Sequence, residues 1–202
     1  MTDTVNHPEI DNRPNAFTQS EIGWTPWLTP LEESELTERH WAALVDASRS
    51  KSPYFMLLAR DPEILEARTK TDKDIFYNTR AGLPRADREL SAAAASRSNG
   101  CIFCASVHSR FASHHSKRTA DVQRLLDEGV EADLGSRRWN AVAEVSAALT
   151  ATPSRFGPAE IARLREEGFD DLEIADAIHG AAFFNWANRL MLSLGEPTPA
   201  AA

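Results

Sequence analysis

Two cysteines and a histidine in the middle of the chain have a spacing that permits thiol redox chemistry. The chain has 202 residues and only two cysteines, Cys101 and Cys104, which are followed by His108. On a helix, residues three or four positions apart lie on one face, so the three side chains would project together. Such a pair also has Cα atoms about 5–6 Å apart, within the range that a disulfide tolerates. The spacing predicts a disulfide that forms and opens beside a group able to transfer protons near neutral pH.

The position of the cysteines at a predicted helix start favours ionised thiols. Asn99-Gly100 ends one predicted helix, and the next runs from Cys101 to about His115. Unpaired backbone N–H groups at a helix start favour thiolate, and in C-x-x-C redox proteins the pKa falls from about 8.5 to between about 3.5 and 7.5. Glu89 lies twelve residues before Cys101. If the two helices form an antiparallel hairpin, its carboxylate returns beside the cysteines and can take a thiol proton.

The same residues allow two other interpretations. Cys101, Cys104 and His108 could supply three ligands to zinc, but a closed tetrahedral site needs a fourth. The chain has no second cysteine pair, so Glu89 is the one obvious candidate. Free cysteines also occur as inert core residues. The helix start and the shared face with His108 favour the redox interpretation, and we expect no metal and no cofactor.

Most of the chain after residue 30 carries helix signals. A capping residue followed by proline occurs at Thr29-Pro30, Ser52-Pro53 and Asp61-Pro62, and each pair predicts a helix start. Asp170 is predicted to cap the last and most apolar helix, which ends at Gly195. No stretch alternates with period two for long enough to indicate a strand. The pattern therefore predicts an all-α, multi-helix bundle.

The two ends of the chain differ from this helical part. Residues 1–30 are rich in proline, lack a helical period and contain apolar groups around Phe17, Trp24 and Trp27. These features predict an extended arm that docks on its own domain or on a neighbouring subunit. A single helical domain is expected over residues 31–195, and residues 196–202 are expected to be a short frayed tail.

Composition excludes several classes of protein. With 22 Lys+Arg against 30 Asp+Glu, the net charge is −8, so the basic surplus typical of nucleic-acid binding is missing. The chain begins without the pattern of a signal peptide, and no apolar run approaches 18 residues. We therefore expect a cytoplasmic protein that binds neither nucleic acid nor membrane. A chain of this length buries about 70% of its unfolded surface, which excludes a disulfide-dependent scaffold.

The order Glu, eleven residues, Cys, two residues, Cys, three residues, His resembles the pattern of the alkyl-hydroperoxidase D family, within the carboxymuconolactone decarboxylase-like superfamily. Residues 84–129 are similar to the family core and residues 161–195 to its closing helix pair, so the core would cover about 84–195. The N-terminal half resembles a longer, peroxidase-related subgroup. The resemblance implies a helical alkyl-hydroperoxidase D-like bundle and a thiol-dependent, antioxidant peroxidase.

The resemblance also implies roles for single residues. Cys104 would attack the hydroperoxide, Cys101 would resolve the product as a disulfide, and Glu89 and His108 would relay protons. A dithiol would serve as reductant, and the protein would form a homo-oligomer, a trimer or hexamer. Family members often carry histidine just before the second cysteine, where this chain has Phe103, which implies a shorter relay and a more apolar pocket.

Two other functions stay open at this point. The cysteine pair could cycle as a non-enzymatic redox sensor or as an electron-transfer partner of another peroxidase. A lactone or decarboxylase activity like that of the superfamily's namesake would not use the pair at all.

Overall fold

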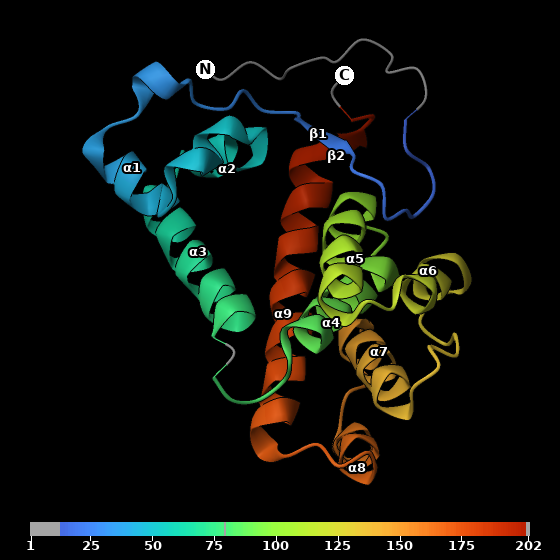
Figure 1. Ribbon diagram of the computed structural model, residues 1–202. Coiled ribbons are helices and arrows are strands. Elements are labelled where there is room, and N and C mark those ends of the chain that lie inside the picture. Colours follow the sequence, from blue (N-terminus) through green and yellow to red (C-terminus); the bar gives the residue numbers. More distant parts are fainter. Residues whose placement is uncertain (1–12, 79, 201–202) are drawn as a thin grey trace.

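The computed structural model describes residues 13–78 and 80–200 and is mostly helical, with two short strands (Figure 1). The chain thus has the mostly helical architecture that the sequence predicts. The α-helices of the described part are α1 (Glu38–Leu44), α2 (Pro53–Leu58), α3 (Pro62–Tyr77), α4 (Arg85–Ser98), α5 (Ile102–Ser116), α6 (Thr119–Glu128), α7 (Arg137–Thr150), α8 (Pro158–Glu166) and α9 (Asp171–Leu194). The strands are β1 (Gly23–Pro26) and β2 (Gly195–Thr198).

Helix α4 lies at the centre of the fold, packed against α5, α7 and α9 (Figure 1). Its alanines 92–95 are fully buried, and small side chains let the neighbouring helices approach closely. Ser91 donates a hydrogen bond to the carbonyl of Ala177 on α9 at 2.9 Å. Opposite it, a Cβ at Gly180 would lie 3.1 Å from Ser91 Oγ. The small residues on both helices therefore let α4 and α9 pack closely.

A buried arginine joins the N-terminal helices to this core. Arg88 on α4 donates hydrogen bonds to the carbonyls of Leu83, Ile75 and Ala81, and it pairs with Asp176 on α9 at 2.8 Å. These contacts fix the link between α3 and α4 against the core.

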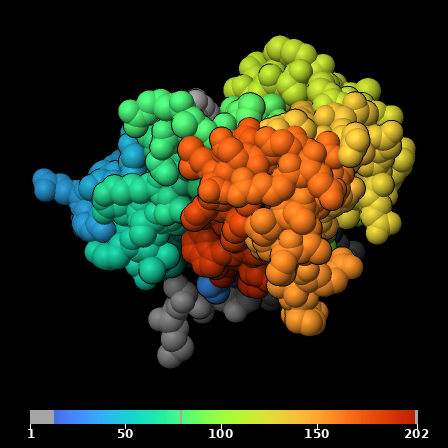
Figure 2. Space-filling view, turned by 90° about the horizontal axis from the view of Figure 1, so that it is seen from below, coloured from blue at the N-terminus to red at the C-terminus, as the bar shows by residue number. Residues whose placement is uncertain are grey.

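In Figure 2, seen from below, α8 and the start of α9 form the middle of the surface, with the N-terminal helices on one side.

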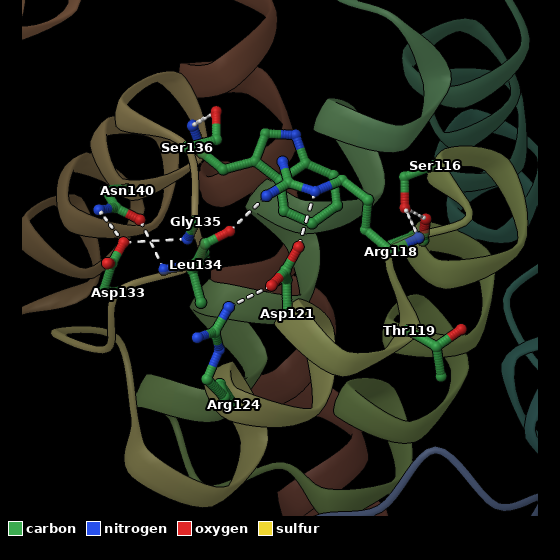
Figure 3. Close-up of polar contacts among 12 residues, drawn as sticks. Ser116, Arg118, Thr119, Asp121, Arg124, Asp133, Leu134, Gly135, Ser136 and Asn140 are labelled. Atoms are coloured by element: carbon green, nitrogen blue, oxygen red, sulfur yellow. Dashed lines mark hydrogen bonds and ion pairs between the residues drawn. The ribbon is translucent and has the colours of Figure 1, made fainter.

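A second arginine fixes the corner between α6 and α7 (Figure 3). Arg118 donates to Asp121 at 2.8 Å and to the carbonyl of Leu134, and its guanidinium lies 4.2 Å from the ring centroid of Trp139. The indole of Trp139 in turn donates to Asp87 on α4 at 2.9 Å. These contacts hold α6 and α7 together and anchor α7 on α4, so their role is structural.

Segments near the two ends of the chain pair in a small antiparallel sheet, so the expectation of no strand was wrong. The expectation of a frayed tail was wrong for residues 196–198, and residues 201–202 of that tail lie outside the described residues. Gly23 pairs with Thr198 and Pro26 with Gly195, directly after α9 ends. A Cβ at Gly195 would lie 2.3 Å from the ring of Trp24, so the close approach requires glycine. Strands of four residues are too short to show alternation, which is why the sequence pattern missed them.

The arm docks on its own domain, one of the two predicted surfaces. Trp24 is buried and meets Tyr54 edge-on, with ring centroids 5.7 Å apart. Gln19 donates to Gln123 on α6 at 2.9 Å, and Arg97 lies 4.3 Å over the ring of Phe17. Residues 1–12 of the predicted arm lie outside the described residues.

Two of the three cap-and-proline predictions are confirmed. Helices α2 and α3 begin after Ser52 and Asp61, and the Asp61 carboxylate accepts from the Ile64 amide at 3.1 Å. The start predicted at Thr29-Pro30 was wrong, because the Leu31 amide bonds to the Met56 carbonyl instead of opening a helix. Helix α1 begins after Thr37.

Candidate active site

The hairpin of α4 and α5 brings two of the predicted site residues into direct contact. Glu89 is fully buried, and its Oε2 lies 2.5 Å from Nδ1 of His108. The turn between the helices is made by Gly100, whose φ of +76° is readily adopted only by glycine. The antiparallel hairpin predicted from the sequence is therefore present, and it puts Glu89 beside the second turn of α5.

Both oxygens of the Glu89 carboxylate are engaged. Arg85 reaches the other oxygen, Oε1, with Nη2 at 2.5 Å and Nε at 2.6 Å. Since a carboxylate only accepts, the hydrogen at the His108 contact sits on Nδ1, which leaves Nε2 to take up a proton. The rings of Phe184 and Phe76 flank the imidazole, with centroids 4.0 and 5.3 Å away. Glu89 therefore fixes the orientation of the His108 imidazole.

The two cysteines occupy the start of α5, as the sequence predicts. Cys101 is the N-cap residue, and Cys104 lies in the first turn. Both are free thiols, and their exposed fractions are only 2% and 6%. His108 follows Cys104 by one helical turn on the same helix. All four predicted site residues thus lie on the α4–α5 hairpin.

The pKa values of the two thiols move in opposite directions. The hydrogen bond from the Cys104 thiol lowers the pKa of Cys101, against the effect of burial, and the backbone amides of Cys104 and Phe103 lower it further. The same hydrogen bond, burial and the charge of Cys101 raise the pKa of Cys104 well above its ordinary value. The expectation that the helix start lowers both pKa values was therefore wrong for Cys104. Cys101 is therefore the thiol of the pair that ionises more readily.

Asn188 on α9 is a site residue that the sequence analysis missed. Its side chain is fully buried and lowers the pKa of both cysteines. Its amide donates to Ser96 at 3.0 Å and accepts from Asn99 at 3.1 Å, so its orientation is fixed. An asparagine in the most apolar helix of the chain was the available signal, since such a group needs polar partners when it is buried.

A cavity of about 320 Å³ opens beside these residues, between α2, α3, α4, α5 and α9. Among the residues that the structure describes, Cys104, His108 and Glu89 line it, whereas Cys101 does not. Phe103 also lines it, consistent with the apolar pocket expected from the sequence. A ligand in the cavity would therefore lie against Cys104 and not against Cys101.

The lining residues that were not predicted include Tyr54, Arg68 and Arg85. The spacing of Arg85 and Glu89, four apart on a helix, was a usable signal for an ion pair. Tyr54 and Arg68 come from α2 and α3, and no sequence pattern links them to the cysteines. Their place in the cavity depends on tertiary packing alone.

Within residues 13–78 and 80–200, no three His, Cys, Asp or Glu side chains are arranged as a metal site. Glu89, the only fourth zinc ligand that the sequence offered, has its oxygens bound to Arg85 and His108. In the same part of the chain, no helix combines the length and the hydropathy needed to cross a bilayer.

Comparison with known proteins finds a family model that matches the part of the chain containing this site. Residues 62–148, which include Glu89, both cysteines and His108, match the model of the Carboxymuconolactone decarboxylase family. The uncharacterized protein YdfG of Bacillus subtilis (strain 168) is 29% identical over 121 residues, which cover 59% of this chain and 80% of that protein.

Solved structures share the fold. A peroxidase-related protein from Ralstonia eutropha JMP134, described as an alkylhydroperoxidase AhpD core, has a TM-score of 0.67 and 21% identity, covering 80% of this chain and 85% of its own. A peroxidase-related protein from Silicibacter sp. TM1040 has a TM-score of 0.66 and 22% identity, covering 82% and 88%. The debrominase Bmp8 has a TM-score of 0.67 at 16% identity, covering 82% and 88%. Neighbours with this fold thus carry more than one activity in their names.

Proposed function

We propose that this chain, in which residues 62–148 form a carboxymuconolactone decarboxylase family domain with an AhpD-like fold, is a thiol-dependent peroxidase acting on organic hydroperoxides. The observation that carries the proposal is the hydrogen bond between Glu89 and His108, because it prepares a proton acceptor one helical turn from Cys104. All three residues line one cavity. The peroxidase-related names of two structural neighbours support the same activity.

In the first step, the Cys104 sulfur attacks a hydroperoxide, ROOH. Its proton, which burial and Cys101 hold on the sulfur, passes to Nε2 of His108. The thiolate attacks the terminal oxygen, the O–O bond breaks, and the alkoxide RO⁻ takes the proton from His108 and leaves as ROH. Cys104 becomes a sulfenic acid. Glu89 balances the positive charge that His108 carries between these two transfers.

In the second step, the Cys101 thiolate attacks the sulfur of the Cys104 sulfenic acid. The S–S bond forms and the S–O bond breaks, and the leaving hydroxide takes from the solvent a proton equivalent to the one that Cys101 released, which gives water. The lowered pKa of Cys101 suits this role, because the resolving group must be ionised when the sulfenic acid appears. A dithiol then reduces the disulfide and is itself oxidised, which restores both thiols.

Peroxide consumption with separate cysteine variants tests this function. Cumene hydroperoxide is supplied with dithiothreitol to the wild type, to Cys104→Ser and to Cys101→Ser. We expect turnover only in the wild type, and a sulfenic acid trapped by dimedone on Cys104 in Cys101→Ser. Equal consumption by the wild type and Cys104→Ser, or none by either, rejects the peroxidase.

A disulfide-cycling redox module is the second candidate, and the deep burial of both thiols favours it. It requires a reversible Cys101–Cys104 disulfide but negligible peroxide turnover by the wild type. Measuring the reduction potential of the pair next to the peroxide rate separates the two functions. An activity on lactones that survives alkylation of both thiols would indicate chemistry of the superfamily's namesake.

We also propose that the protein is a homo-oligomer, a trimer or hexamer. The arm and the C-terminal half of α9 expose large apolar side chains, namely Trp27, Leu28, Trp186 and Leu192. Isolated surface leucines are ordinary, but several on adjoining segments are typical of an interface. Light scattering after size-exclusion chromatography tests this, and a monomer at micromolar concentration would contradict it.

A further inference from the structure

We propose that Arg68 and Tyr54 form an anion-binding subsite in the cavity, and that the preferred substrate is a small organic hydroperoxide carrying a carboxylate. This inference rests on the proposed peroxidase function for the reacting end of the substrate. The subsite itself follows from the geometry of the cavity and can be tested without any turnover.

Arg68 is a buried cation whose hydrogen-bonding groups are largely unused. Its side chain is only 7% exposed, and neither Nε nor Nη1 has a hydrogen-bond partner among the described residues. Its ion pair with Asp72 is loose, at 3.4 Å. The rings of Phe55 and Phe183, with centroids 5.2 and 5.3 Å away, hold the guanidinium but satisfy none of its N–H groups. Burying a guanidinium with unsatisfied N–H groups destabilises the folded protein unless a ligand accepts their hydrogen bonds.

Tyr54 supplies a second unused donor beside it. The residue is 8% exposed, and Oη has no hydrogen-bond partner in the described part of the chain. Burial raises the pKa of Tyr54 to about 12, although Arg68 lowers it through its charge and through its closeness to the hydroxyl, so the hydroxyl keeps its proton. The edge contact with Trp24 fixes the ring. Two donors of different kinds thus line the same cavity without an acceptor.

The balance of charges in the cavity also favours an anion. Three arginines and two carboxylates line it. Glu89 is matched by Arg85, and Asp72 lies between Arg68 and Arg49, at 3.4 and 3.9 Å. One positive charge is therefore left over when His108 is neutral, although the whole chain carries a net charge of −8. A carboxylate would neutralise it and could accept two N–H groups of one guanidinium.

The subsite lies within reach of the reacting sulfur. The charge of Arg68 lowers the pKa of Cys104, and the charge of Cys104 raises that of Tyr54, so the three groups are electrostatic neighbours. At about 320 Å³, the cavity is at the lower end of the range for small-molecule sites. A compact molecule could thus place its carboxylate at Arg68 and its hydroperoxide at Cys104, with an apolar body against Phe103 and Phe184.

Direct binding of an unreactive acid and its uncharged analogue tests the subsite. The reduced wild type is titrated by calorimetry with 4-isopropylbenzoate and with 4-isopropylbenzamide. We expect the carboxylate to bind at least about tenfold more tightly, as charged hydrogen bonds do. Arg68→Met should reduce this preference to less than about threefold, and Tyr54→Phe should weaken carboxylate binding a few-fold. Arg189→Met, which removes an exposed positive charge on α9 outside the cavity, should leave it unchanged.

Equal binding of the acid and the amide by the wild type overturns the subsite. An undiminished preference in a folded Arg68→Met protein overturns it as well. If Arg68→Met does not fold, as judged by circular dichroism, the ligand pair on the wild type and on Tyr54→Phe decides.

A turnover comparison separates this inference from the peroxidase itself. Cumene hydroperoxide and its para-carboxylate share the same reacting group, so their kcat/KM ratio reports the added charge alone. A ratio of ten or more that falls in Arg68→Met supports the substrate class. Turnover of both peroxides at equal rates keeps the peroxidase and rejects the subsite. Tight carboxylate binding without turnover of either keeps the subsite and rejects the peroxidase.

Discussion

Replacing Glu89 by glutamine tests the proton relay with almost no change in shape. Arg85 contacts Oε1 of Glu89 at 2.5 and 2.6 Å, and arginine has only donors. The glutamine must therefore turn its oxygen toward Arg85 and its NH₂ group toward His108. An NH₂ group donates, so Nδ1 of His108 must accept, and the ring hydrogen moves to Nε2. In this tautomer, the imidazole cannot take the proton of Cys104.

The size of the effect follows from the step that is lost. Positioned general bases contribute about 10²- to 10⁴-fold to a rate, so kcat/KM for cumene hydroperoxide should fall by that factor. Sulfenic acid formation on Cys104 should slow equally in a single turnover, because the loss lies in the first chemical step. The control is Glu144→Gln, which removes a half-exposed carboxylate that pairs with Arg163 at 3.0 Å on the surface. It should keep wild-type kinetics.

A small loss would refute the reasoning. If Glu89→Gln retains its fold and loses less than about fivefold in kcat/KM, then the tautomer of His108 does not matter and the relay is absent. Stopped-flow measurement between pH 6 and 9 supplies the necessary rates. Circular dichroism of both variants verifies that the buried substitution leaves the helices intact.

Three further predictions follow from the same contacts. Asn188→Ala should raise the pKa of Cys101, so the rise of iodoacetamide labelling with pH, which tracks thiolate, should move to higher pH; an unmoved profile would contradict the role of Asn188. Cys101→Ala removes the sulfur to which the Cys104 thiol donates a hydrogen bond and the charge that opposes ionisation of Cys104. Labelling of Cys104 should therefore begin at lower pH, and a shift to higher pH would argue against this hydrogen bond. Trp24→Ala should lower the free energy of unfolding in urea by about 3–5 kcal/mol, whereas the exposed Trp27→Ala should change it by about 0.5 kcal/mol or less, and similar losses for both would mean that the arm is not docked as described.

The part of the site that the sequence revealed depends on local geometry. Cys101, Cys104 and His108 lie on one helix, so their spacing alone predicts a shared face. Glu89 lies on the preceding helix, and the Asn99-Gly100 break was enough to predict a hairpin that brings it beside the cysteine helix. Local periodicity and turn chemistry therefore suffice to predict the positions of these four residues.

The rest of the site depends on contacts that no local pattern encodes. Arg68 and Tyr54 reach the cavity because α2 and α3 pack against α9 and β1. Asn188 comes from the far end of the chain, more than eighty residues after Cys104. The opposite pKa shifts of the thiols also escaped prediction, since the helix start acts on both but their shared hydrogen bond distinguishes them.

The strands were missed for a related reason. Residues 23–26 and 195–198 pair across almost the whole chain, and each strand has four residues and a proline. Propensity and alternation argue against such segments, yet the end of α9 and the buried Trp24 bring them together. Tertiary packing therefore overrides local preference at this edge of the fold.

Mass spectrometry of the reduced protein after one equivalent of cumene hydroperoxide tests the central claim most directly. We expect the Cys101–Cys104 disulfide of the wild type to form at the same rate as the peroxide is lost. We expect Cys101→Ser to contain a sulfenic acid on Cys104. Two free thiols in the wild type beside unconsumed peroxide, or a sulfenic acid on Cys101 in Cys104→Ser, would contradict Cys104 as the group that attacks the peroxide.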